Sequence, residues 1–234
     1  MYSHNFTMLT VTNSGYKRLT ENCILSLINI NFPLEKIIIY AMDTECQQYF
    51  KDKYPSITVK LNDYINKEHE RYLQKDWNNI TMQKINIISK EFDNYEYLIL
   101  FDGDIVFNKL DFVDYMLKTM DEDKSLDLLA QQEFKGNNTN EICSGFYIIR
   151  SSQHTKKYFN TELFTQDTQH TCNDQTYINR LRPNLNWKYL PIELFPNGKY
   201  FYEYHPDEAH IIHFNFVFFH DKEGRMKRYN KWFL

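Results

Sequence analysis

The chain has 234 residues, which suits one domain with a substantial hydrophobic core. Its formal net charge is −4, and no basic stretch interleaved with aromatic residues dominates the sequence, so we expect no nucleic-acid partner. Aromatic residues make up 17% of the chain. Because Tyr and Trp stack on sugar and base faces, this composition is compatible with a carbohydrate or nucleotide site.

The cysteines and the apolar segments indicate the compartment. Cys23, Cys46, Cys143 and Cys172 do not have the spacing of zinc ligands, so we expect free thiols in a reducing compartment. The first residues contain no basic segment followed by an apolar one, and no apolar run approaches the roughly 20 residues of a membrane helix. We therefore expect no membrane span and a cytoplasmic protein (host cytoplasm or virion if the source is viral), with a homodimer left open as its assembly.

The first part of the chain alternates predicted strands and helices. Apolar runs predict strands at residues 6–11, 37–41 and 57–61. Apolar periodicity predicts a helix at residues 19–30, and Thr44 is a capping residue for a second helix at 44–53. This βαβαβ order is typical of a parallel sheet with a nucleotide crevice.

The same alternation continues to the C-terminus, after a polar connection at residues 62–76. We expect strands at 97–101, 126–130, 145–149, 187–190 and 210–214, and helices at 79–92, 110–120, 153–164, 174–181 and 224–234, with a loop at 133–141. The sequence contains no repeat, low-complexity segment or convincing linker. It therefore predicts a single α/β domain over residues 1–234, with a mostly parallel central sheet flanked by helices.

Two carboxylates follow the run at residues 97–101, which is apolar throughout and so predicts a strand buried on both faces. Asp102 and Asp104 flank Gly103 at the carboxyl end of this strand, where open α/β sheets bind their ligands. Buried carboxylates are costly unless paired, hydrated or bound to a cation. With a glycine between them that lets backbone or phosphate come close, the pair can direct two oxygens at one Mg²⁺ or Mn²⁺. The alternative is a polar strand end with two solvated carboxylates.

Further short motifs surround this pair in a fixed order. They are Thr12-Asn13 with Tyr16, Ser144-Gly145-Phe146, Asp174-Gln175 and His213-Phe214-Asn215. Together with Asp102-Gly103-Asp104 they resemble the nucleotide-diphospho-sugar transferases of GT-A fold, in particular the branch related to plant cell-wall xylosyl- and arabinosyltransferases. The pattern is also similar to glycogenin-like retaining enzymes. The resemblance extends from residue 6 to residue 232 and rests on the order of the motifs.

The resemblance implies a role for each motif. Thr12, Asn13 and Tyr16, counted together with Thr10, hold the uridine of a UDP-sugar, and Asp43 accepts a hydrogen bond from the base. Lys84 approaches the ribose or phosphates, and Gly103 lies beside them. Asp102, Asp104 and His213 bind Mn²⁺ or Mg²⁺, and Ser144 and Gly145 line the donor-sugar pocket. Asp174 and Gln175 are the catalytic pair beside the anomeric carbon, and Lys222 neutralises the leaving diphosphate.

The expected chemistry requires these residue types independently. Cleavage of a sugar–phosphate bond leaves extra negative charge on the diphosphate, which a divalent cation and a Lys stabilise. Two carboxylates and an imidazole are suitable ligands for that cation. The sugar becomes oxocarbenium-like, so a neighbouring carboxylate or amide stabilises it. The expected function is transfer of a sugar, with retention, from a nucleotide-diphosphate donor to a glycan, protein or glycoprotein acceptor.

The chain departs from the family pattern at two places. Cys143 stands where the family usually has Asn before Ser-Gly, which removes an amide expected to contact the sugar. The family usually has Gly a few residues after the His-x-Asn segment, whereas this chain has Phe216-Val217-Phe218-Phe219. We expect a bulky Phe219 to shift the closing tail, which makes Lys222 the site most affected.

Each motif also has a purely structural interpretation. His213 lies in an apolar stretch and can be a core histidine, Asp174 can begin a helix, and Lys222 can be an ordinary exposed charge. Asp43 and Ser144-Gly145 can be turn residues.

Two other functions remain open. One is a haloacid-dehalogenase-type phosphatase with Asp102 as nucleophile and Asp104 as acid/base, although in that class the motif follows the first strand. The other is a non-catalytic module that binds nucleotide sugars or glycans.

Overall fold

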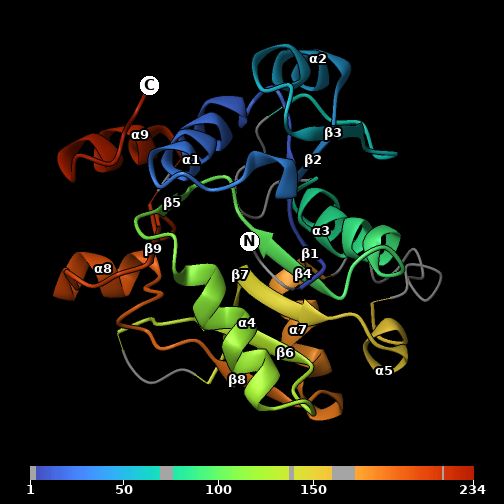
Figure 1. Cartoon of the computed structure of the whole chain (residues 1–234). Coiled ribbons are helices and arrows are strands. Elements are labelled where there is room, and N and C mark those ends of the chain that lie inside the picture. The colour runs from blue at the N-terminus through green and yellow to red at the C-terminus, as the bar shows by residue number, and fades with distance from the viewer. Residues whose placement is uncertain (1–3, 69–75, 137–139, 160–171, 218) are drawn as a thin grey trace.

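The computed structural model describes residues 4–68, 76–136, 140–159, 172–217 and 219–234. Its centre is a seven-stranded sheet in the order β3-β2-β1-β4-β7-β6-β8 (Figure 1). The strands are β1 (Phe6–Thr12), β2 (Ile37–Ala41), β3 (Thr58–Leu61), β4 (Tyr97–Phe101), β6 (Leu128–Gln132), β7 (Ile142–Arg150) and β8 (Trp187–Tyr189). Only β7 is antiparallel to its neighbours, so the other six run in one direction. The predicted α/β class with a mostly parallel sheet is confirmed.

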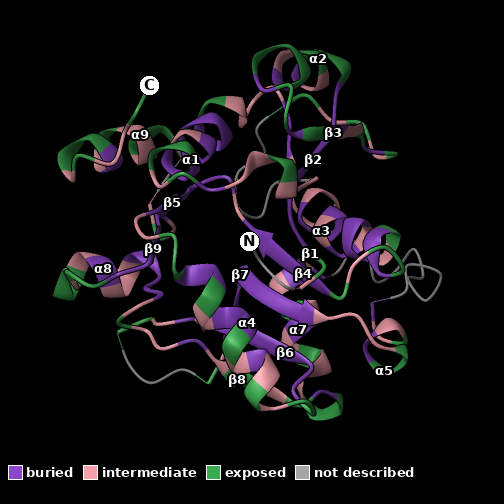
Figure 2. Cartoon of the chain, in the orientation of Figure 1, coloured by how far each residue is buried: buried purple, intermediate pink, exposed green. Residues whose placement is uncertain are grey.

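Helices cover both faces of the sheet, and every residue of the central strand β4 is buried (Figure 2). One apolar cluster contains side chains of α1 (Lys17–Asn29), α2 (Thr44–Lys53) and α4 (Phe112–Glu122). The cluster on the opposite face contains side chains of α3 (Trp77–Glu91) and α7 (Asp174–Leu181). Burial on both faces explains why the central strands read as continuous apolar runs.

A small antiparallel ribbon lies beside the main sheet (Figure 1). It pairs β5 (Ile105–Phe107) with β9 (Ile211–His213), and Ile105 lies opposite His213. A third apolar cluster packs the ribbon against α8 (Gly198–Tyr204) and α9 (Phe219–Arg228). Beyond α9, the chain returns to α1, where Asn22 bonds the backbone of Lys231 (3.0 Å) and of Phe233 (2.6 Å).

Several element boundaries differ from the sequence prediction. β5 and α8 were not predicted, and short helical segments η1 (Leu34–Lys36) and η3 (Arg182–Asn184) precede β2 and β8. β7 begins at Ile142 instead of 145, because Ile142 still pairs with Gln132 of β6. α5 (Gln153–Lys156) ends well before 164, and residues 160–164 lie outside the described residues. The C-terminal helix was predicted at 224–234 but occupies 219–228, after which the tail leaves the helix to pack on α1.

Among the described residues, no helix is long and apolar enough to cross a membrane. The single-domain prediction over residues 1–234 stays a prediction. The predicted connection at 62–76 is described only in part, since residues 69–75 lie outside the described ranges.

Candidate active site

The two aspartates sit where β4 ends, at the carboxyl edge of the parallel strands. Asp104 is almost fully buried, and β5 begins directly after it. A Cβ atom on Gly103 would lie 2.4 Å from Thr20 Oγ1. Position 103 therefore has to be glycine because the backbone packs closely on α1, and this contact was not expected from the sequence.

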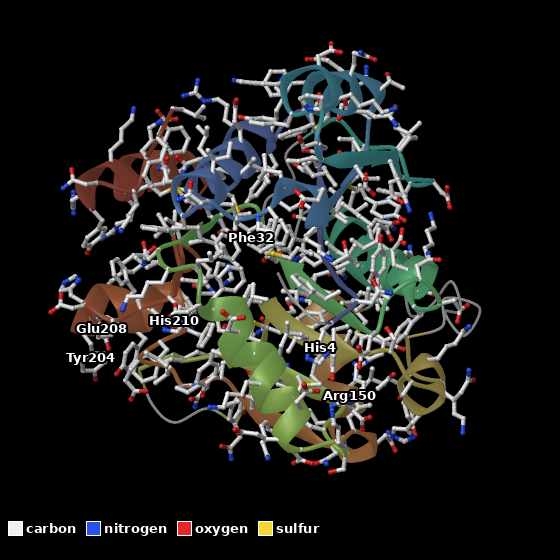
Figure 3. All side chains as sticks on the ribbon, viewed as in Figure 1. His4, Phe32, Arg150, Tyr204, Glu208 and His210 are labelled. Carbon is white, nitrogen blue, oxygen red and sulfur yellow. The ribbon has the colours of Figure 1, made fainter. Side chains whose placement is uncertain are left out.

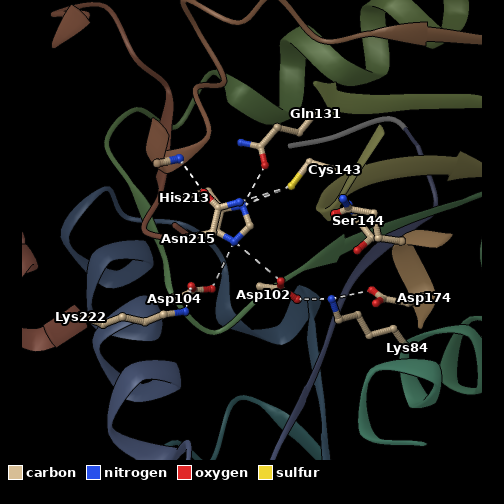
Figure 4. A network of polar contacts seen from close by, with 12 residues as sticks. Lys84, Asp102, Asp104, Gln131, Cys143, Ser144, Asp174, His213, Asn215 and Lys222 are labelled. Carbon is tan, nitrogen blue, oxygen red and sulfur yellow. Dashed lines mark hydrogen bonds and ion pairs between the residues drawn. The ribbon is translucent and has the colours of Figure 1, made fainter. Parts of the chain in front are cut away.

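His213 completes a cluster with the aspartates, from the last position of β9 (Figure 4). Its Nε2 atom lies 3.7 Å from Asp102 Oδ2 and 3.4 Å from Asp104 Oδ1. One ligand atom from each of the three residues lies within 4.8 Å of the others. A Cβ atom on Gly145 would lie 2.1 Å from His213 Cε1, so Gly145 leaves the room that the imidazole occupies. Two carboxylates and an imidazole that converge in this way fit a hard divalent cation such as Mn²⁺ or Mg²⁺.

Each aspartate of the cluster is also paired with a lysine from a separate helix. Lys84 of α3 lies 2.6 Å from Asp102 Oδ1, and Lys222 of α9 forms an ion pair with Asp104. Burial raises the pKa of Asp102 and outweighs the opposing effect of Lys84. Burial also acts to raise the pKa of Asp104, but Lys222 and then His213 outweigh it and hold that pKa far below its usual value. Each carboxylate of the cluster is thus paired with a partly buried lysine.

Lys84 also connects the metal cluster to the predicted catalytic carboxylate. Its ammonium lies 2.8 Å from Asp174 Oδ2, so Lys84 bridges Asp102 and Asp174 (Figure 4). The cap of α7 is Asn173, whose side chain accepts from the Thr176 amide. Asp174 is therefore not the capping residue and its carboxylate is directed into the site. Burial acts to lower the pKa of Lys84, but Asp102 and Asp174 outweigh it and raise that pKa.

The residues predicted to contact the donor sugar lie next to one another. Gln175 is the second residue of α7, and its Oε1 accepts from the Ser144 amide at 3.4 Å. Ser144 and Gly145 lie inside β7, close to its start. Because β7 runs against its neighbours, its first residues lie at the same edge as the carboxyl ends of the other strands. The structure thus brings the Ser-Gly and Asp-Gln motifs together.

The residues predicted to hold the nucleotide are engaged in contacts within the protein. Asp43 caps α2 at the Cys46 amide (2.8 Å) and accepts from the Ser14 amide and hydroxyl, both at 2.7 Å. Asn13 donates to the Glu68 carbonyl (2.7 Å) and accepts from the Tyr16 amide (2.9 Å). These bonds shape the loop after β1, and a nucleotide contact by either side chain stays a prediction.

The other residues predicted to bind the nucleotide lie in β1 or directly after it. Thr12 bonds Thr20 of α1 through their hydroxyls (2.8 Å), and Tyr16 OH accepts from Lys222 (3.1 Å). The Thr10 hydroxyl is buried and makes no hydrogen bond within the described part of the chain. Tyr16 therefore connects the β1 loop with α9, and Thr10 stays a predicted site residue.

The two departures from the family pattern have structural explanations. Cys143 Sγ faces the ring of His213, 3.6 Å from Nδ1. Phe216 has φ +57°, a left-handed conformation that favours glycine and is unusual for a bulky residue. Phe216 thus has a backbone conformation that favours glycine, and α9 brings Lys222 to Asp104.

Two further contacts at this site were not predicted from the sequence. The Oε1 atom of Gln131 on β6 lies 2.9 Å from His213 Nδ1, where it can accept a hydrogen bond from the ring. Asn215 Oδ1 accepts from the Gly198 amide at 2.6 Å. A Cβ atom on Gly198 would lie 2.2 Å from the Asn215 carbonyl oxygen, so α8 begins tightly against the segment after β9. The glutamine was not detectable because it lies in a strand that carried no functional motif.

Comparison with known proteins identifies the family. A family model described as nucleotide-diphospho-sugar transferase matches residues 33–229. The chain belongs to this family. A curated relative, the UDP-galactose:fucoside alpha-3-galactosyltransferase of Dictyostelium discoideum, is 22% identical over an alignment of 290 residues. That alignment covers 98% of this chain but 43% of the relative, so the chain spans less than half the length of the curated relative it matches.

Solved glycosyltransferase structures share the fold of this family member. A glycosyltransferase involved in glycosylation of the major capsid of PBCV-1 is 13% identical with a TM-score of 0.59, covering 96% of this chain and 99% of that one. The WbbM bifunctional glycosyltransferase is 12% identical with a TM-score of 0.62, over 99% of this chain and 52% of that one. A Pyrobaculum calidifontis mannosyltransferase in complex with GDP-Man and Mn²⁺ is 11% identical with a TM-score of 0.51, covering 82% of this chain and 56% of that one. The GT-A fold expected from the sequence is confirmed.

Proposed function

We propose that this transferase moves a sugar from a nucleotide-diphosphate donor to a glycan or glycoprotein acceptor, with a divalent cation held by Asp102, Asp104 and His213. The observation that carries the proposal is the convergence of these three side chains, with Asp174 joined to them through Lys84. A bound Mn²⁺ or Mg²⁺ would act as a Lewis acid that stabilises negative charge on the departing diphosphate. UDP-sugars are the proposed donors, as in the name of the curated relative.

Two lysines and the pair Asp174 and Gln175 have separate roles in the proposed reaction. Lys84 and Lys222 are partly buried ammonium groups beside the proposed metal ligands, and both would neutralise phosphate oxygens. Asp174 and Gln175 lie together at the start of α7, where they would stabilise positive charge at the anomeric carbon. Removing one preorganised contact of this kind typically costs roughly 10²–10³-fold in rate.

Retention of configuration is part of the proposal. It is compatible with attack by Asp174 to give a glycosyl-enzyme, or with departure and attack on the same face of the sugar. The two routes differ in whether a covalent intermediate forms on Asp174. Mass spectrometry of a quenched reaction distinguishes them, because the first route adds one sugar mass to the peptide that contains Asp174.

The first experiment is a panel of nucleotide sugars that includes UDP-galactose and GDP-mannose, assayed with Mn²⁺ for release of free nucleotide. We expect slow hydrolysis of one donor, loss of this activity with EDTA, and faster turnover with an acceptor such as a fucoside. His213→Ala and Asp104→Ala should lose the metal-dependent activity. If either variant in the presence of chelator were as active as the wild type with Mn²⁺, the metal assignment would be contradicted.

The two alternative functions give different results in the same panel. A non-catalytic binding module would be stabilised by one nucleotide sugar in a thermal-shift assay but would release no nucleotide from it. A dehalogenase-type phosphatase would hydrolyse a phosphomonoester instead. Family membership and the position of Asp102 after the fourth strand of the chain leave that last alternative without support.

A further inference from the structure

Gln131 is a buried amide whose polar atoms are all used, and its orientation can be deduced from its partners. Its side chain is 0% exposed. The Nε2 group donates to the carbonyls of Phe195 (3.1 Å) and Pro196 (3.0 Å), which can only accept. The amide therefore cannot be turned around, and its Oε1 atom must face His213 Nδ1 at 2.9 Å.

This orientation favours a proton on Nδ1 of His213, because the other neighbour of that nitrogen, Cys143 Sγ at 3.6 Å, is only a weak donor and a weak acceptor. Gln131 Oε1 is only an acceptor, so the 2.9 Å contact is a hydrogen bond only when Nδ1 is protonated. In the neutral ring Nε2 then presents its lone pair to Asp102 and Asp104. Without Gln131, the two carboxylates would attract the proton to Nε2, because N–H donation to a carboxylate is the stronger bond. That tautomer cannot bind a metal through Nε2.

We propose that Gln131 is a positioning residue that selects the metal-binding tautomer of His213. The proposal rests on the proposed function for its consequence, metal affinity, but the tautomer itself can be measured without metal or substrate. The same amide holds the segment of Phe195 and Pro196 just before α8, so its donor and acceptor ends have separate roles. The acceptor end acts on His213, and the donor end acts on the fold.

Two substitutions separate these roles. Gln131→Met removes both ends at similar size, whereas Gln131→Glu keeps an acceptor for Nδ1 and loses the donors to the two carbonyls. We expect both variants to unfold at lower temperature, because each leaves buried carbonyls without their donors. Only Gln131→Met should change the tautomer. Gln132→Met is the matched control, since Gln132 is partly exposed and no hydrogen bond of its side chain is found among the described residues.

The primary measurement is the long-range ¹H–¹⁵N correlation pattern of the metal-free protein at alkaline pH, with His213 assigned from a His213→Ala spectrum. We expect a proton on Nδ1 in the wild type, Gln131→Glu and Gln132→Met, and a shift of the proton toward Nε2 in Gln131→Met. A proton on Nε2 in the wild type would overturn the proposal. So would identical patterns in the wild type and Gln131→Met.

The second measurement is Mn²⁺ binding, followed by the EPR signal of the free ion. Loss of an outer partner of a histidine ligand typically weakens metal binding by about 10–100-fold, which we expect for Gln131→Met but not for Gln131→Glu. Equal Mn²⁺ affinity of Gln131→Met and the wild type would contradict the proposal. If the wild type binds no Mn²⁺, the metal part of the proposed function fails, and the NMR pattern alone decides whether Gln131 sets the tautomer.

Discussion

Lys84 neutralises two carboxylates at once, so replacing it should have a large and metal-dependent effect. Its ammonium lies 2.6 Å from Asp102 and 2.8 Å from Asp174, and its side chain is 13% exposed. Lys84→Met keeps the length of the side chain and removes its charge. The variant therefore leaves two carboxylates at the site without their shared cation.

The size of the effect follows from the burial of the group. Removing one partner of a buried ion pair costs about 3–5 kcal/mol, and partial hydration of Asp102 favours the lower end. For a domain of this size, about 3 kcal/mol corresponds to a melting temperature lowered by about 6–12 °C. The loss should be greatest at neutral pH, because burial raises the pKa of Asp102 and protonation of that carboxylate at low pH removes part of the need for a cation.

Mn²⁺ should reverse part of this loss, because the ion supplies positive charge to Asp102. A ligand at 100 times its Kd stabilises the folded state by about 2.7 kcal/mol. Because the variant lacks the competing Lys84 ammonium, it should reach that gain at a lower Mn²⁺ concentration than the wild type. Sugar transfer should nevertheless fall. The assay is a thermal melt with and without Mn²⁺, with Lys84→Arg as the control that keeps the charge. An unchanged melting temperature in Lys84→Met, or a smaller Mn²⁺ effect than in the wild type, would refute the reasoning.

Three further predictions concern other positions. Phe216→Gly should be more stable than Phe216→Ala by about 1 kcal/mol in chemical denaturation, because φ +57° is strained for any side chain. Elsewhere alanine is usually the more stabilising of the two, and that order at position 216 would contradict the left-handed assignment. Gly145→Ala should lose Mn²⁺ binding, because its Cβ would overlap His213. Gly224→Ala is the control: its Cβ would have nothing within 4 Å, so this variant should be stabilised. The same Mn²⁺ binding and stability in the two variants would refute the packing argument. His210 (Figure 3) is buried, and burial lowers its pKa in the folded protein, so below pH about 6.5 the unfolded state binds more protons and stability falls. His210→Gln should make the pH dependence of unfolding between pH 7 and 5 less steep, and an unchanged slope would count against this assignment.

The sheet could be predicted from the sequence because its central strands are buried on both faces. β2 and β4 have the predicted bounds, and their side chains are all buried. β5 could not be predicted, since it has three residues and is defined by its pairing with β9, about a hundred positions later. α8 was missed because its sequence is rich in aromatic residues, and its start depends on the Asn197 cap and on contact with the segment after β9.

In the candidate site, too, contacts between residues far apart in the sequence could not be predicted. The order of motifs predicted that Asp102, Asp104 and His213 would meet, and the structure places them together. The motifs could not show that Lys84 bridges Asp102 and Asp174, because side chains from three separate parts of the chain have no common signal in one sequence. Gln131 was invisible for a related reason. Its importance comes from two carbonyls and a ring nitrogen that belong to distant segments.

The pairing of Ile105 with His213 determines when the proposed metal ligands can first come together during synthesis. A ribosome builds the chain from its N-terminus, so both aspartates emerge long before His213 does. Until β9 has been made and has joined β5 in the correct register, the proposed metal site has its two aspartates but not its histidine. A shift of one residue in this short ribbon would turn His213 to the opposite side. Binding of Mn²⁺ by all three side chains would therefore indicate that β9 has paired correctly with β5. A translation product that stops before residue 213 would retain the aspartates but could not bind Mn²⁺ with three ligands.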